Sequence, residues 1–132
     1  MRTFSDLFTI LNAKDATGTG LTMLVEDYDH VVIQLTSATS ANFTVKCQGS
    51  VSDDAPDFSA SQVATNAWDY IDMIDLQNNA SIDGDTGVAF AGTDDVRLFE
   101  VNVNALKWLC FTVTARSAGT VTVKAKGFSS GT

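Results

Sequence analysis

The sequence predicts an all-β fold, specifically a single antiparallel two-sheet sandwich of jelly-roll or immunoglobulin-like topology. The first observation is the alternation of apolar and polar residues in the last third of the chain, from Val96 to Phe128. Such alternation places successive side chains on opposite faces of a sheet, one of which is buried. The second is the glycine-containing turn Ser117-Ala118-Gly119 between two alternating runs. The third is the spacing of about eight short strands between polar turns, which is typical of sandwiches.

The parity of residues within each expected strand predicts the hydrophobic core. Strands are expected over residues 21–25, 30–36, 42–50 and 87–91 and in the final meander. The residues that share the apolar parity, and that we expect to be buried, are Val31, Ile33, Leu35, Phe43, Val45, Leu109, Phe111, Val113, Val121 and Val123. Cys47 has the same parity as Phe43 and Val45, whereas Cys110 has the opposite parity to Leu109. We expect two free thiols, because buried cysteines commonly pack as small hydrophobic side chains. This expectation fits assembly in a reducing cytoplasm.

The N-terminal segment has a different pattern. Its apolar residues Phe4, Leu7, Phe8 and Leu11 have the spacing of one helical face. A helix this short is marginal in water, so its apolar side must dock, either on an open end of its own sandwich or on a neighbouring subunit. We therefore expect a helical or extended arm over residues 1–20 and a β-sandwich domain over residues 21–132.

The charge distribution restricts the class of partner. The net charge of -8 argues against nucleic acid, because phosphate contacts require clustered basic residues. No segment is long and apolar enough to span a membrane and no signal peptide is visible, so we expect no membrane partner. Fifteen of the acidic residues precede residue 96, whereas five basic residues and only Glu100 follow Asp95. This asymmetry either steers one subunit onto another or reflects acidic loops and lysine-protected strand edges.

Candidate catalytic and metal-binding residues are few. His30 is the only histidine and has no accompanying nucleophile motif, so a surface role is favoured over catalysis. The run from Asp83 to Gly87, with a second aspartate at Asp85, resembles part of a calcium loop but lacks the downstream glutamate. Carboxylate pairs fall in expected loops, which gives no basis for a glycosidase. We expect no enzymatic activity, no cofactor and no metal.

Large aromatic residues and late lysines mark a candidate interface. Trp68, Tyr70 and Trp108 would form a sugar-stacking platform or an interface if exposed, and ordinary core if buried. We favour core or subunit interface over sugar binding. Together with the N-terminal stripe and the last lysines, the candidate interface consists of Phe4, Leu7, Phe8, Leu11, Trp68, Tyr70, Trp108, Lys124 and Lys126.

The final meander carries a family resemblance. Its features are an acidic turn, a strand and two further alternating runs, which read Thr93-Asp94-Asp95, Val101-Asn102-Val103, Leu106 to Ala115 and Gly119 to Val123. With these features, the chain resembles small β-sandwich virion proteins of tailed bacteriophages, especially capsid decoration or cement proteins. Upstream, Val51-Ser52-Asp53 and Trp68-Asp69-Tyr70 lie where such proteins have strands broken by a long loop, so the likeness covers roughly half of the chain.

The resemblance implies a non-enzymatic protein that binds the major capsid protein on the outer capsid surface and stabilises the shell. It also implies a homo-oligomer, either a dimer or a trimer, that is made in the host cytoplasm and located in the virion. A head fibre, tail or baseplate component is equally compatible with the same features. The alternative class is a carbohydrate-binding or host-attachment module that carries Trp68 or Trp108 as a stacking platform.

Overall fold

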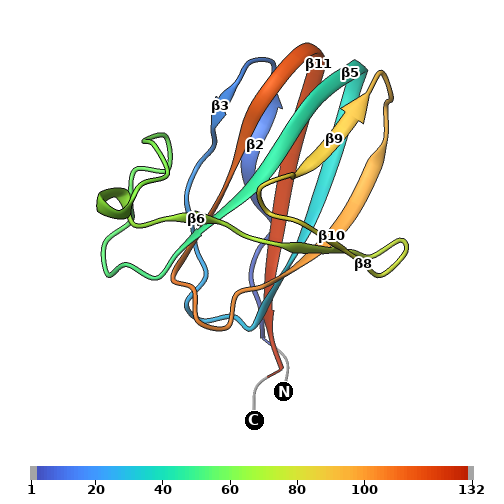
Figure 1. Ribbon diagram of the computed structural model, residues 1–132. Helices are drawn as coiled ribbons and strands as arrows, with labels where there is room; N and C mark the ends of the chain where they lie inside the picture. The colour runs from blue at the N-terminus through green and yellow to red at the C-terminus, as the bar shows by residue number, and fades with distance from the viewer. Residues whose placement is uncertain (1–2, 131–132) are drawn as a thin grey trace.

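The computed structural model describes residues 3–130, and these form an almost entirely β structure (Figure 1). The all-β prediction is confirmed. The elements in chain order are β1 (Thr3–Phe4), β2 (Phe8–Lys14), β3 (Gly18–Thr19), β4 (Met23–Leu24), β5 (His30–Ser50), the 3-10 helix η1 (Ala64–Asn66), β6 (Asp69–Tyr70), β7 (Met73–Asp75), β8 (Ala80–Ile82), β9 (Val88–Ala91), β10 (Val96–Asn102) and β11 (Trp108–Ser129). No helix in this part of the chain is long and apolar enough to cross a bilayer.

Two long strands, β5 and β11, organise the molecule. They pair antiparallel from Trp108 opposite Ser50 to Phe128 opposite His30. All described strands join one sheet with the main order β1-β11-β5-β10-β7-β8, while β2, β3 and β4 pair with β11, and β6 and β9 pair with β5. The hydrogen bonding therefore differs from the expected two separate sheets, because β5 and β11 continue from one part of the structure into the other without a break.

Both long strands bend at the same level, where they arch together over one end of the molecule (Figure 1). Thr39, Ser40 and Gly119 have φ angles of 64°, 53° and 77°, and the β5–β11 register shifts on both sides of Ala118. A Cβ on Gly119 would lie 2.4 Å from the Ala41 Cα, so this position requires glycine. Residues 117–119, which the sequence predicts as a turn between two strands, instead lie within β11 beside the bend of β5 and help to bend a continuous ribbon, as bulges do.

The bend divides the sheet into two named parts. The β10 half contains residues 30–37 of β5 and 120–129 of β11, together with β1, β2, β10, β7 and β8. The β9 half contains residues 42–50 of β5 and 108–118 of β11, together with β3, β4, β6 and β9. Both halves contribute side chains to one apolar cluster, and all ten residues predicted for the core are buried in it.

The N-terminal segment is extended and not helical, so the helical form expected for residues 1–20 is wrong. Residues 8–14 form β2, which pairs with β11 through an irregular register that shifts on both sides of Val123. Ile10 and Leu11 are consecutive yet both buried. Because the irregularity breaks the two-residue period, the apolar spacing resembles that of a helix although the backbone is extended. The division at residue 20 into an arm and a domain stays a prediction.

Strain at the bend leads to a stability prediction. Thr39 is exposed, and its left-handed backbone is unfavourable for a β-branched residue. We expect Thr39→Gly to raise the free energy of unfolding by about 1 kcal/mol, because glycine adopts this region without the steric cost. Urea unfolding measures the change. The control is Thr36→Gly, where the β-strand conformation favours threonine and stability should fall; a destabilised Thr39→Gly protein would show that no strain is stored at this position.

Candidate interaction surface

The side of the β10 half that points away from the core forms what we call the outer face. The ladder aligns Lys126 with Val32, Val32 with Glu100, and Glu100 with Ile74 across four strands. The next outward row contains Lys124, Gln34 and Leu98. These residues alternate with the buried positions Ile33, Phe99 and Val123, so their outward direction follows from the period of the strand.

The outer face is unusually apolar for a surface open to water. Six large apolar side chains on it or beside it are 37% to 58% exposed: Phe4, Leu7, Ile74, Leu76, Val96 and Leu98. A half-buried antiparallel sheet normally carries polar residues at such positions. Apolar residues that gather on one face, with polar residues at its border, are typical of an interaction site.

A groove in this face brings both ends of the chain together. It has a volume of ≈ 310 Å³, and its lining residues are Phe4, Leu7, Val32, Gln34, Leu98, Lys124, Lys126 and Phe128. The pairing of β1 with the end of β11 creates it, because Phe4 lies directly opposite Phe128. Four residues of the predicted interface, Phe4, Leu7, Lys124 and Lys126, thus meet at one site.

Two lysines, Lys124 and Lys126, line the groove of the outer face, although the chain as a whole is acidic. The Lys126 ammonium lies 5.6 Å from the centre of the Phe4 ring. Neither Lys124 nor Lys126 takes part in any of the ion pairs found within residues 3–130. Glu100 is the acid beside them, and its Oε1 lies 2.9 Å from Nδ1 of His30, which stacks on Phe128. The groove therefore presents two unpaired ammonium groups among apolar side chains.

The other predicted interface residues lie elsewhere. Leu11 is buried in the core, and Phe8 packs partly against it. Trp68 is only 8% exposed and forms an edge contact with Tyr70, with their ring centres 5.0 Å apart. Trp108 is half-buried, and its indole N–H donates to the Ser52 carbonyl at 3.0 Å. Trp68 therefore offers no open ring face for stacking.

A second groove, which we call the η1 groove, lies in the β9 half beneath the long loop before β6. Its volume is ≈ 440 Å³, and the apolar part of its lining includes Val51, Val63, Trp68, Ile71 and Leu106. The loop is held down by buried Gln48, whose side-chain amide donates to the Phe58 carbonyl at 2.9 Å, and by Ser50, whose hydroxyl donates to the Ala67 carbonyl at 2.7 Å. These bonds lead us to expect that the groove is preformed.

The η1 groove has an acidic border. Exposed Asp69 lines it, and the loop that continues from Val51 carries exposed Asp53, Asp54 and Asp57. Lys107 directly follows Leu106 of the groove lining, and its ammonium lies 3.9 Å from a Glu26 carboxylate oxygen. Figure 1 shows this loop and its helical turn, in green, projecting from the side of the molecule, away from the two termini.

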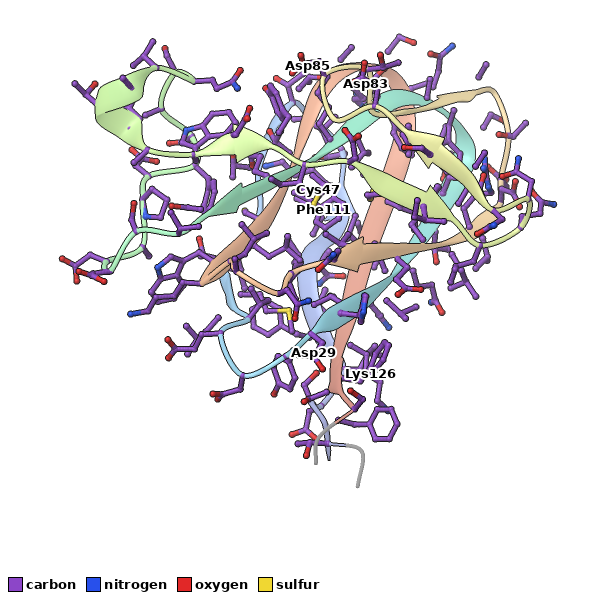
Figure 2. The ribbon with its side chains drawn as sticks, turned by 60° about the horizontal axis from the view of Figure 1, so that its bottom comes forward. Asp29, Cys47, Asp83, Asp85, Phe111 and Lys126 are labelled. Carbon is purple, nitrogen blue, oxygen red and sulfur yellow. The ribbon has the colours of Figure 1, made fainter. Side chains whose placement is uncertain are left out.

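The two cysteines and the two aspartates of the calcium-like loop have structural surroundings. Figure 2 shows Cys47 in the interior near Phe111, and burial raises the pKa of its thiol, with Cys110 adding to the rise. Burial also raises the pKa of Cys110 to about 11, so both free thiols are protonated at neutral pH. Asp83 and Asp85 lie away from Lys126 in Figure 2, and the Asp83 side chain accepts the Asp85 amide at 3.0 Å. Residues 3–130 contain no cluster of three potential metal ligands.

Sequence reasoning missed half of the outer face. It did not identify the exposed apolar residues Ile74, Leu76, Val96 and Leu98. The signal was present in β10, where Val96 and Leu98 have the parity opposite to buried Phe99. Apolar residues on both faces of one strand indicate that both faces are covered within the molecule, or that one of them binds a partner.

Comparison with known proteins shows a shared fold. The sequence matches no protein-family model and no curated protein. The solved structure of SPBc2 prophage-derived protein YomS is similar, with a TM-score of 0.68 and 15% identity over 98% of this chain and 96% of YomS. PBSX exported protein XepA is similar with a TM-score of 0.72 and 12% identity over 97% of this chain, which corresponds to 38% of XepA. At these identities, the likeness shows that the chain has the fold of YomS and of the matching part of XepA.

Proposed function

We propose that this protein is a non-enzymatic structural protein of a bacteriophage virion, specifically a capsid decoration protein. In this role it is made in the host cytoplasm, binds the major capsid protein on the outer capsid surface and stabilises the shell. The observed outer face supports a structural role most directly, because it is suited to contact between proteins. A sheet that exposes apolar side chains beside two unpaired lysines is suited to a broad protein surface, because apolar anchors provide affinity and charge provides orientation.

The structural neighbours support the phage origin in this proposal. One neighbour is described as derived from the SPBc2 prophage, and the other is a PBSX protein, so both are phage-derived. Their names do not mention a capsid. The decoration role therefore rests on the resemblance of the final meander and on the outer face. The carbohydrate-binding alternative gains no support from Trp68, because its ring is buried.

Binding to purified particles tests this function. We expect the full chain to be found in purified virions by mass spectrometry. We also expect it to cosediment with capsids prepared without it and to raise the temperature at which those capsids release DNA. Bovine serum albumin mixed with the same capsids is the control for trapping in the pellet. Absence of the protein from purified virions would refute the proposal, and labelling of the tail rather than the head by a specific antibody would refute the decoration role.

A further inference from the structure

Two surfaces of this chain are complementary in both polarity and charge. The outer face presents Phe4 and Leu7, each more than half exposed, beside Lys124 and Lys126. The η1 groove offers an apolar floor bordered by Asp69. Both surfaces expose apolar side chains that a single molecule leaves uncovered, including Val51 and Val63 at the η1 groove.

We propose that the outer face of one copy docks into the η1 groove of a second copy. In this contact the Phe4 and Leu7 side chains enter the groove, and the two lysines face Asp69 and the acidic loop. This inference deepens the proposed function and rests on it for the role of the assembled protein. The occupant is a second copy because the chain itself contains a surface that complements the outer face, with an apolar floor and an exposed aspartate at its border.

The position of the two surfaces determines the kind of assembly. The outer face belongs to the β10 half and the η1 groove to the β9 half, so one copy uses a different patch from its neighbour. A contact between different patches is heterologous, and it produces a closed ring or an open chain rather than a symmetric dimer. Each subunit in the interior of such an assembly has both surfaces covered.

Asp6 and Glu100 oppose this scheme locally, because both are acidic residues close to the apolar anchors. Glu100 has His30 as a neighbour at 2.9 Å, whereas Asp6 precedes Leu7 and is exposed. The two lysines line the groove itself, whereas neither acid does. We expect higher ionic strength to slow association without abolishing the complex, since screening weakens the charge contacts and leaves the apolar ones.

The mass of the full chain in solution tests the proposal, measured by sedimentation velocity over a range of protein concentrations. We expect wild type to form species larger than a dimer or a concentration-dependent series. Leu7→Asp should raise the dissociation constant about tenfold or more, because it places a carboxylate at an apolar anchor. Leu21→Asp is its matched control, since Leu21 is 65% exposed and lines neither groove. Melting temperatures establish that each variant is folded.

Charge variants identify the partner surface. Lys126→Glu should weaken association, whereas Lys14→Glu, which changes the net charge equally, should not. Asp69→Asn and Asp69→Lys should also weaken it, although both reduce the overall repulsion between copies. The double variant Lys126→Glu with Asp69→Lys should recover association, because the two surfaces regain opposite charges. Asp69→Asn keeps a side-chain oxygen for the Tyr70 amide, which is 2.8 Å from the carboxylate, and so guards against local unfolding.

Three outcomes would overturn the inference. They are a wild type that stays monomeric at every concentration, an oligomer that Leu7→Asp leaves intact, and an oligomer that responds to Lys126→Glu but not to either change at Asp69. The last result would indicate a symmetric contact through the outer face alone. Failure of the proposed function is distinguishable, because a protein that assembles as described but is absent from virions refutes the virion role and leaves the contact between copies standing.

Discussion

Replacement of Phe111 by alanine should lower the free energy of unfolding by about 3–5 kcal/mol, because the change removes a large buried side chain and leaves a cavity. Phe111 is fully buried, and it pairs with Cys47 in the ladder between the two longest strands. The core on both sides of the bend is a single cluster, so we expect little room for collapse around the site. For a chain of this length, the loss corresponds to a fall in melting temperature of roughly 10–20 °C.

Thermal and urea unfolding of the purified variant measure this effect. The matched control is Phe4→Ala, which removes the same side chain from a position that is 56% exposed. Surface substitutions of this kind usually change stability by about 0.5 kcal/mol or less. Equal melting temperatures for wild type and Phe111→Ala would contradict the assignment of Phe111 to the core, and equal losses in the two variants would contradict the contrast in burial.

Removal of the Arg97 guanidinium should have the second-largest effect. Asp75 is 2% exposed, and the Arg97 side chain donates to its carboxylate. The same carboxylate also accepts the Gln77 amide at 2.9 Å. Arg97→Met should therefore lower the free energy of unfolding by about 3 kcal/mol, because it leaves the buried Asp75 charge without its partner. This value is at the low end for a broken buried ion pair, because the partly exposed Arg97 site still admits water.

The double variant Asp75→Asn with Arg97→Met separates the buried charge from the loss of packing. Asparagine keeps an oxygen for the Gln77 amide but carries no charge, so the double variant should be more stable than Arg97→Met alone. Urea unfolding of the two single variants and the double variant gives the coupling between the side chains. A coupling close to zero would show that the pair contributes as little as an exposed surface ion pair.

The outer face determines which kind of contact the protein can make with a partner. Six exposed apolar side chains gather on or beside this face, whose central strands β5 and β11 are paired on both sides within the sheet. The face therefore offers apolar contact through side chains rather than strand addition through free backbone groups. A partner that covers it must supply a protein surface, which a second copy does and a small sugar does not.

Local pattern was enough to predict the β class and ten residues of the core. The alternation of Val31, Ile33 and Leu35 identifies their buried face without any knowledge of their partners, because side chains in a strand alternate wherever the strand lies. The same reasoning placed Lys124 and Lys126 on the open side of β11. Cys110 was a partial exception: it has the outward parity but is buried, and its thiol is held near the carbonyls of Gly20 and Leu21.

The sequence by itself thus determined the β class, the buried parity and several members of the interaction surface, since each depends on neighbours along the chain. Only the tertiary structure decided that residues 8–14 form a strand and that one bent sheet replaces two. It also placed Phe4 beside Phe128. The physical reason is the range of the contacts: the Gly127 amide donates to the Ser5 hydroxyl at 2.8 Å across 122 residues of sequence, and no local period specifies such a partner.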